Sequence, residues 1–82
     1  MAEQTPYFRD VLTLGFPRRL RQARESCGFS ADELGRALGM TRANISKYET
    51  GRQTPTIDMC ERMSIVLKVK PAWLAWGVEP KE

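Results

Sequence analysis

The stretch from Ser30 to Gly51 constrains the fold of this chain more than any other part of it. It contains two short runs with a helical spacing of apolar residues, separated by a Gly-Met pair. Ser30 and Glu33 have the spacing of a capping box, in which each side chain bonds the backbone N–H of the other residue. Gly39 ends the first run because glycine tolerates the left-handed conformation, and the hydroxyl of Thr41 can start the second. The stretch therefore predicts two short helices joined by a tight turn.

The second helix of this pair has two unlike sides. Its apolar side carries Ile45 and Tyr48, and a surface of small, amide and cationic residues covers the rest. Such a surface on so short a helix has little use in a protein core. It suits the major groove of DNA, where side chains read base edges by hydrogen bonds and methyl contacts. The residues of this surface are Arg42, Ala43, Asn44, Ser46 and Lys47.

The size and charge of the chain fit one small binding domain. It has 82 residues, of which 41% are hydrophobic, enough for a modest core but not for a separate catalytic cleft. Its net charge is +3, and residues 16–54 hold eight Arg and Lys against four Asp and Glu, a local net charge of +4. A basic block that coincides with the helix pair is what neutralisation of nucleic-acid phosphates requires.

The cysteine and histidine content argues against metal and enzyme chemistry. The chain has two cysteines, Cys27 and Cys60, and no histidine, so the usual ligands of a four-coordinate zinc site are missing. Both cysteines lie at apolar helical positions, where we expect them to pack in the core. Without histidine no nucleophile and base can be paired, so we expect no cofactor and no enzyme. No apolar run is long enough for a signal peptide or a membrane span, which favours a cytoplasmic protein.

Helical spacing also occurs on both sides of the helix pair. A first helix is expected over residues 17–27, and the pair follows it over residues 30–49. Residues 50–55 have the composition of a turn and loop. A fourth helix is expected over residues 56–67 and a short fifth one over residues 71–76. The expected inner side of the fourth helix consists of Ile57, Cys60, Met63, Ser64 and Leu67.

These segments predict one compact all-α domain of five helices over residues 16–77. Residues 1–15 would form an N-terminal arm, and residues 78–82 a C-terminal tail. The arm is too apolar for a plain disordered tail. It could be a short helix or a strand, packed on the domain or on a second subunit, and the sequence does not choose between these.

Taken in order, these features resemble the lambda-repressor-like, Cro and Xre-type helix-turn-helix family. Each matching element alone is weak evidence for the family, but all of them occur in the order and at the spacing of the family over residues 16–77. The resemblance implies a compact five-helix domain that binds DNA and regulates transcription. The matching positions are Arg24, Gly28, Phe29, Ser30, Glu33, Leu34, Gly39, Ile45, residues 48–51, Pro55, Thr56, Trp73 and Leu74.

The resemblance also implies a role for particular positions. Family members place the start of their third helix in the major groove. Carried over, Thr41 and Asn44 would touch phosphates or base edges. Arg42 is the strongest candidate for a base contact, because a guanidinium can bridge O6 and N7 of guanine; a phosphate-bound or solvent-facing cation is the alternative. The other expected DNA contacts are Ala43, Ser46 and Lys47 at bases and Arg52 at the backbone.

Arg24 and Glu49 call for a structural interpretation. The family has an arginine and a glutamate at these two places, which form an internal ion pair between adjoining helices. We therefore assign both residues to stability and not to catalysis or DNA contact.

Three positions depart from the family pattern. Ala31 stands where members commonly have a glutamine that contacts a backbone phosphate, so Arg36 or the helix N-terminus would have to replace that anchor. Gly35 stands where a small residue, usually alanine, lets the two helices approach. Lys68 stands where a glycine would end the fourth helix, which predicts another cap or a strained lysine.

Surplus apolar residues near the C-terminus favour a homodimer. Met59 and Ile65 lie off the expected inner side of the fourth helix, and Trp76 and Val78 follow where a small core has little left to bury. Trp76 could instead cap the core, as we expect for Trp73. A dimer would match a palindromic site in double-stranded DNA whose half-sites lie about 34 Å apart.

The sequence thus predicts a sequence-specific transcriptional regulator, acting as a homodimeric repressor at a palindromic operator. The alternative is a protein-interaction module, such as an antitoxin-type protein that binds a toxin through the arm and the Trp76 surface. Salt separates the two, because DNA binding weakens steeply as salt rises and an apolar interface barely changes.

Overall fold

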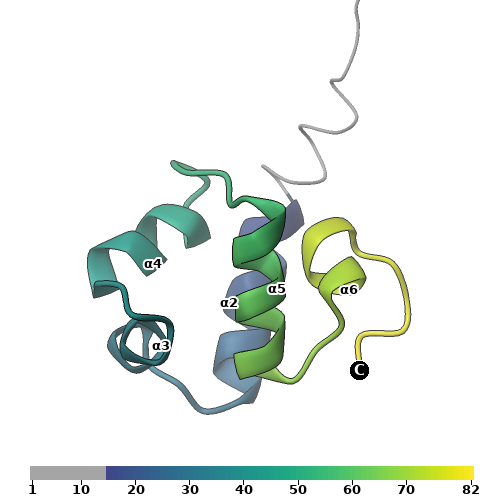
Figure 1. The fold of residues 1–82 in the computed structure, drawn as a ribbon, viewed down its shortest axis with the longest axis horizontal. Helices are drawn as coiled ribbons and strands as arrows, with labels where there is room; N and C mark the ends of the chain where they lie inside the picture. The colour runs from purple at the N-terminus through teal and green to yellow at the C-terminus, as the bar shows by residue number, and fades with distance from the viewer. Residues whose placement is uncertain (1–14) are drawn as a thin grey trace, which may run out of the picture.

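A computed structural model describes residues 15–82, which form five α-helices and no strand (Figure 1). The all-α, five-helix class expected from the sequence is confirmed. The expected N-terminal arm falls almost wholly on residues 1–14, outside the described part of the chain. In chain order the helices are α2 (Phe16–Ser26), α3 (Ala31–Leu38), α4 (Arg42–Glu49), α5 (Ile57–Leu67) and α6 (Pro71–Trp76).

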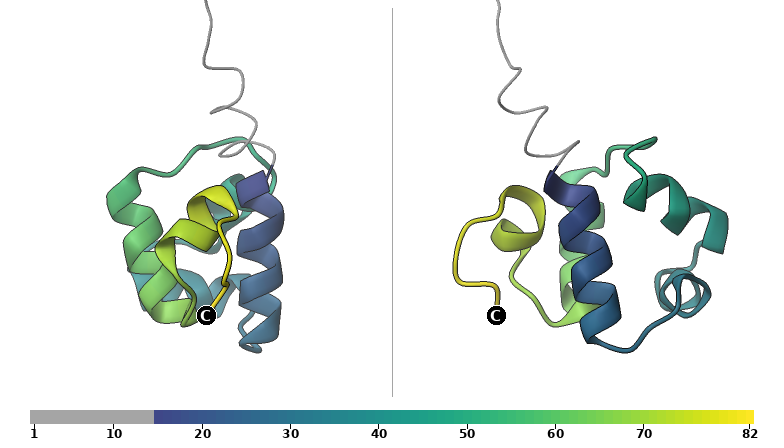
Figure 2. Two further views of the ribbon diagram at one scale, coloured as in Figure 1. Left: turned by 90° about the vertical axis from the view of Figure 1, so that its right-hand side faces the viewer. Right: turned by 180° about the vertical axis from the view of Figure 1, so that it is seen from behind.

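The helices lie in three groups along the longest axis of the domain. α3 and α4 occupy one end, α2 and α5 the middle, and α6 the other end, as the opposite views agree (Figures 1 and 2). The longest of these helices has 11 residues, so none has the length or the apolar character that a bilayer crossing requires.

Hydroxyl caps start three of the helices. The Ser30 hydroxyl accepts the N–H of Glu33 at 3.0 Å, and the Glu33 carboxylate accepts the N–H of Ser30 at 2.8 Å, which completes the capping box. This bond from the Ser30 backbone also lowers the pKa of Glu33. Thr41 and Thr56 each accept the N–H three residues further on. These caps fix the helix starts because the first N–H groups of a helix have no partner within it.

The turn between α3 and α4 packs closely on α3. Gly39 ends α3 in the left-handed conformation, with φ 73°. The next residue, Met40, donates its N–H to the carbonyl of Gly35 at 2.8 Å. A Cβ atom on Gly35 would lie 2.7 Å from the carbonyl oxygen of Met40. Glycine at position 35 therefore allows an approach between helix and turn that an alanine would oppose.

Each helix contributes a side chain without solvent exposure to a single core. The side chains are Leu20 of α2, Leu34 of α3, Ile45 of α4, Met63 of α5 and Leu74 of α6. Full burial of a side chain of this size stabilises the fold by about 1.5–3 kcal/mol. The helix pair is therefore one part of a single packed unit.

Two residues expected in the core lie outside it. Ile57 is 48% exposed, because it opens α5 at the end beyond the core. Cys27 is exposed, because α2 ends one residue earlier, and its thiol donates to the carbonyl of Leu67 at 3.2 Å. Conversely, Met59 packs against the core instead of standing off it. Cys60 is buried as predicted, and burial raises the pKa of its thiol to about 11.

Arg19 joins the first and last described helices. Its guanidinium donates to the carbonyls of Leu74 and Ala75 at 2.9 and 2.8 Å. It therefore bonds carbonyls at the C-terminal end of α6, where a helix lacks internal partners and favours a cation. Partial burial lowers the pKa of Arg19.

Candidate nucleic-acid interface

α4 is held to the domain by one side only. Ile45 is fully buried and Tyr48 is 6% exposed. The Tyr48 ring meets the ring of Phe16 edge to face, with centroids 6.3 Å apart and an interplanar angle of 85°. These contacts fix the rotation of the helix about its own axis, so the opposite side faces away from the core.

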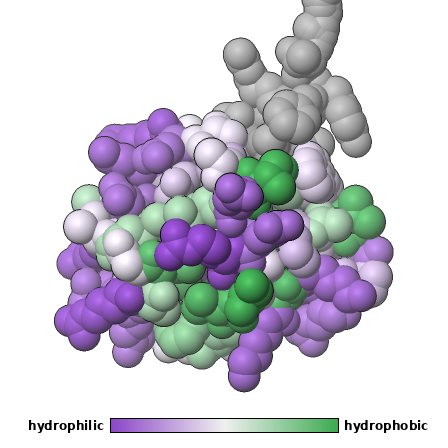
Figure 3. Space-filling model, in the orientation of Figure 1, coloured by the Kyte–Doolittle hydropathy of each residue, from purple (hydrophilic) through white to green (hydrophobic). Residues whose placement is uncertain are grey.

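The outward side of α4 carries the residues expected to read bases. Arg42, Ala43, Ser46 and Lys47 are all exposed, whereas Asn44 is half-buried. None of the first four is covered by other described parts of the chain, which is the condition for insertion into a groove. In the space-filling view, hydrophilic atoms cover the loop after α4, and the surface over α5 mixes hydrophilic with hydrophobic atoms (Figure 3).

Thr41 caps the start of α4 and is exposed to solvent. Its hydroxyl oxygen accepts the N–H of Asn44 at 3.2 Å as the cap of α4. A hydroxyl has one donor and two acceptor lone pairs, so the cap leaves its O–H free to donate to a phosphate oxygen. The position is exposed at the N-terminal end of the helix, where the helix dipole favours an anion.

The loop after α4 folds back onto the end of that helix. The N–H groups of Arg52 and Gln53 both donate to the carbonyl of Lys47, at 2.9 and 3.2 Å. Gly51 makes this return possible with a φ of 78°, and Thr50 donates its hydroxyl to the last turn of the helix. The structure thus holds the exposed Arg52 close to the C-terminal end of α4.

Arg24 and Glu49 form a two-bond contact between α2 and α4. The Nε and Nη2 atoms of Arg24 donate to the two carboxylate oxygens of Glu49 at 2.6 and 3.1 Å. The side chains are 12% and 9% exposed. The hydrogen bond to Glu49 raises the pKa of Arg24. Arg24 also donates to the carbonyl of Phe29 at 2.8 Å, so it ties the loop before α3 to the same point.

A hollow of about 220 Å³ opens between the start of α3, the length of α4 and the side of α2. We call it the interhelical hollow. The methyl group of Ala31 forms part of its wall, so the missing glutamine leaves open space at this place. Its other walls are formed by Arg21, Arg24, Arg42, Ser46, Glu49 and Thr50.

Arg36, one of the two replacements expected for the absent glutamine, is not at this place in the structure. Arg36 pairs with Asp32 at 3.0 Å on the exposed side of α3 and does not line the interhelical hollow. Arg21 of α2 does line it. Sequence reasoning missed Arg21, because the spacing along α2 does not tell which neighbour each exposed residue of that helix faces.

The apolar residues expected at a dimer surface are exposed but do not all meet. Ile65 is 77%, Val78 55% and Trp76 40% exposed. Trp76 lines a groove of about 360 Å³ between α5 and α6 together with Ile57, which the sequence had suggested for the core. Ile65 and Val78 lie outside this groove.

Residues 20–74 match a family model described as helix-turn-helix. The HTH-type transcriptional regulator DicA of Escherichia coli is 31% identical over 71 residues, which cover 87% of this chain and 51% of the regulator. A SPbeta prophage-derived uncharacterized HTH-type transcriptional regulator of Bacillus subtilis, YonR, is 34% identical over 62 residues, which cover 76% of this chain and 57% of YonR. The chain thus spans little more than half the length of these curated relatives.

Solved structures show the same fold. The hypothetical transcription factor NHTF from Neisseria aligns with a TM-score of 0.73 and 25% identity, over 92% of this chain and 85% of that one. The restriction-modification controller protein C.AhdI from Aeromonas hydrophila aligns with a TM-score of 0.72 and 23% identity, over 84% of this chain and 97% of that one. At 23% identity, the similarity to C.AhdI is evidence for the fold alone.

Proposed function

The chain belongs to the helix-turn-helix family, as its lambda-repressor-like residues predict, and we propose that it is a sequence-specific DNA-binding regulator of transcription. The observation that carries this proposal is the exposed polar side of α4, held outward by the burial of Ile45 and Tyr48. The relatives named above are transcriptional regulators and not enzymes. Such a protein would work on DNA in the cytoplasm.

In the proposed complex, the N-terminal half of α4 enters the major groove. Arg42 has the chemistry to donate two parallel hydrogen bonds to O6 and N7 of a guanine. Ala43 can touch a thymine methyl group, and Ser46 and Lys47 can donate to base acceptors further along the same helix. All four are exposed on one short helix, so a single docking position can serve them together.

Contacts to phosphates would flank these base contacts. Thr41 and Asn44 lie at the start of α4, and Arg52 is held at its other end by the folded-back loop. Phosphate contacts fix the position of a protein on the duplex and carry no sequence information of their own. Arg52 and Thr41 would therefore set the register in which Arg42 reads its base pair.

We further propose that the protein acts as a homodimer on a palindromic operator and represses by covering a promoter. One small domain offers few phosphate contacts, and a second copy doubles them. The support for a dimer is the exposed apolar surface at Ile57, Ile65, Trp76 and Val78. The groove that Ile57 and Trp76 share favours that part of the surface as its centre.

Selection of binding sites from random duplex DNA tests this proposal. We expect enrichment of a palindrome with half-sites about one helical turn apart. Repeating the selection with Arg42→Ala should relax one base pair in each half-site, while Arg18→Ala, which removes an exposed arginine of α2, should leave the selected sequence unchanged. If Arg42→Ala weakens binding equally for all sequences, Arg42 contacts a phosphate and the base assignment is wrong.

The groove lined by Ile57 and Trp76 also favours a second candidate function, a module that binds a protein such as a toxin. The two functions differ in their response to salt. DNA binding should weaken by orders of magnitude between 50 and 200 mM salt if several phosphates are contacted, whereas an apolar protein interface should barely respond. A complex that forms equally well at both salt concentrations would support the protein-binding function.

A further inference from the structure

We infer that the interhelical hollow is a binding site for one phosphate of the DNA backbone, and that Arg21 of α2 is its main ligand. The inference rests on the proposed DNA-binding function and adds a contact from a helix outside the helix-turn-helix. The hollow lies between the start of α3, the length of α4 and the side of α2.

The charge of the hollow suits an anion. Three arginines and one glutamate line it, so its walls carry a net charge of +2. The glutamate, Glu49, binds mainly to Arg24, which donates to both of its oxygens at 2.6 and 3.1 Å, whereas its contact with Arg21 is longer, at 4.0 Å. Since Arg24 is bound to Glu49 and Arg42 is proposed to read a base, Arg21 is the cation of the hollow that remains for a phosphate.

The contacts of Arg21 with carboxylates are long, so a phosphate can replace them. Its Nε lies 3.6 Å from a carboxylate oxygen of Glu25 and 4.0 Å from one of Glu49. A charge-assisted hydrogen bond between a guanidinium and an anion is about 2.7–2.9 Å long. The side chain of Arg21 is also 64% exposed, so it can turn toward a phosphate without losing a tight partner.

The shape and place of the hollow point to the DNA backbone. The small side chain of Ala31 leaves the space open, and Ser46 also lines it. Arg42 and Ser46 belong both to this wall and to the side of α4 proposed to face the groove. A phosphate backbone that borders the major groove would therefore pass the mouth of the hollow.

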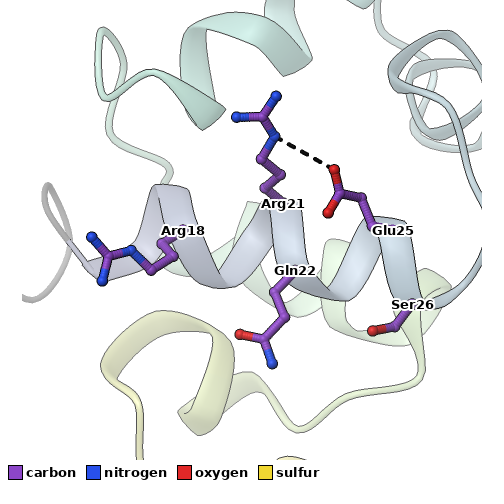
Figure 4. A pocket seen from close by; sticks show the side chains of 5 residues that line it. All are labelled: Arg18, Arg21, Gln22, Glu25 and Ser26. Carbon is purple, nitrogen blue, oxygen red and sulfur yellow. Dashed lines mark ion pairs between the residues drawn. The ribbon is translucent and has the colours of Figure 1, made fainter.

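The direction of the side chains distinguishes Arg21 from its neighbours on α2. In Figure 4, Arg21 and Glu25 rise on the side of α2 that faces α4, whereas Gln22 points toward α6. Arg18 stands apart from Arg21, nearer the start of the helix, and does not line the hollow (Figure 4). Arg18 is thus a matched control, because it has the same charge on the same helix.

Salt titration of DNA binding with Arg21→Gln, Arg18→Gln and Arg21→Lys tests the inference. The probes are the duplex selected by the wild-type chain and a scrambled duplex of equal length. Arg21→Gln should weaken binding to both duplexes by about tenfold, since a hydrogen bond to a charged group is lost. It should also reduce the slope of log affinity against log salt by about 0.9, the contribution of one phosphate. Arg18→Gln should leave affinity within about twofold and the slope unchanged, and Arg21→Lys should keep the slope.

The possible failures are distinct. If Arg21→Gln behaves as Arg18→Gln does, the phosphate site is wrong while the proposed DNA-binding function stands. If Arg21→Gln instead loses preference at one base pair, Arg21 reads a base and the assignment to a phosphate is wrong. If the wild-type chain binds neither duplex, the proposed function fails and the inference fails with it. Thermal unfolding of the three variants close to that of the wild type confirms that they are folded.

Discussion

At the scale of the single residue, the backbone of Lys68 is the clearest place where sequence and conformation disagree. Lys68 ends α5 with φ 59° and ψ 41°, and it is the one non-glycine residue between positions 15 and 82 with a positive φ. A residue with a Cβ atom pays about 1–2 kcal/mol for this conformation. The cap itself is well formed, because the next residue, Val69, donates to the carbonyl of Ser64 at 3.0 Å. The lysine is therefore tolerated and not required by the cap.

We predict that Lys68→Gly raises the free energy of unfolding by about 0.5–1 kcal/mol. Glycine removes the steric cost of the left-handed conformation, and its greater freedom in the unfolded chain offsets part of the gain. Urea denaturation measures the change. Lys70→Gly is the matched control, since Lys70 is exposed with an ordinary φ of −78° and should only lose stability. Equal losses in both variants would show that the backbone at Lys68 is not strained.

Single residues also show which features the sequence could predict. The caps at Ser30 and Thr41 depend on groups three residues apart, so local spacing predicted them and the structure confirms them. Ile57 and Cys27 were wrongly expected in the core, because their burial depends on where a helix ends relative to its neighbours. Arg21 at the interhelical hollow was missed for a similar reason, since only the packing of α2 against α4 brings it there.

At the scale of the element, α4 depends on its neighbours for its stability. It has eight residues, and isolated helices shorter than about 12–15 residues are marginal in water. Its burial of Ile45 and Tyr48 and the bonds of Glu49 supply what the isolated segment lacks. The same contacts fix which side of α4 faces outward, so the stability of this helix and its proposed presentation to DNA have a common origin.

We predict that Arg24→Ala lowers the free energy of unfolding by about 3–5 kcal/mol. The substitution leaves the Glu49 carboxylate 9% exposed with only Arg21 near it, at 4.0 Å, and a buried charge without a partner is costly. Chemical denaturation measures the loss. Arg36→Ala breaks the pair with Asp32, whose side chains are 78% and 52% exposed, and should cost less than about 0.5 kcal/mol. Similar losses in the two variants would contradict a structural role for the Arg24–Glu49 pair.

At the scale of the whole molecule, the two ends of the domain carry different chemistry. The end with α3 and α4 presents cations and small polar residues, and the surface of α5 and α6 exposes Ile57 and Trp76 around an apolar groove. These regions lie on different helices, and α4 and α6 lie on opposite sides of α2 and α5 in Figure 1 and in the right view of Figure 2. The proposed contact with DNA and the proposed contact with a second copy therefore use separate surfaces.

This arrangement predicts that Trp76→Glu prevents dimer formation and leaves the exposed side of α4, which is proposed to contact DNA, unchanged. A carboxylate placed in the groove beside Ile57 would have to be desolvated in a dimer, which is unfavourable without a partner. Sedimentation should therefore find the wild-type chain dimeric and Trp76→Glu monomeric at the same concentration. Ile65→Glu, an equally drastic change at a residue outside the groove, should remain dimeric.

DNA binding then shows whether the dimer matters for function. On a palindrome, the wild-type chain should fill both half-sites together, and Trp76→Glu should fill them independently, with lower affinity for the pair. On a duplex with a single half-site, only one domain contacts the DNA. Trp76→Glu should therefore bind this duplex with the same affinity as one wild-type subunit. A wild-type chain that sediments as a monomer at high micromolar concentration, with and without the palindrome, would contradict the homodimer. Loss of dimers in Ile65→Glu but not in Trp76→Glu would move the interface from the groove to the exposed side of α5.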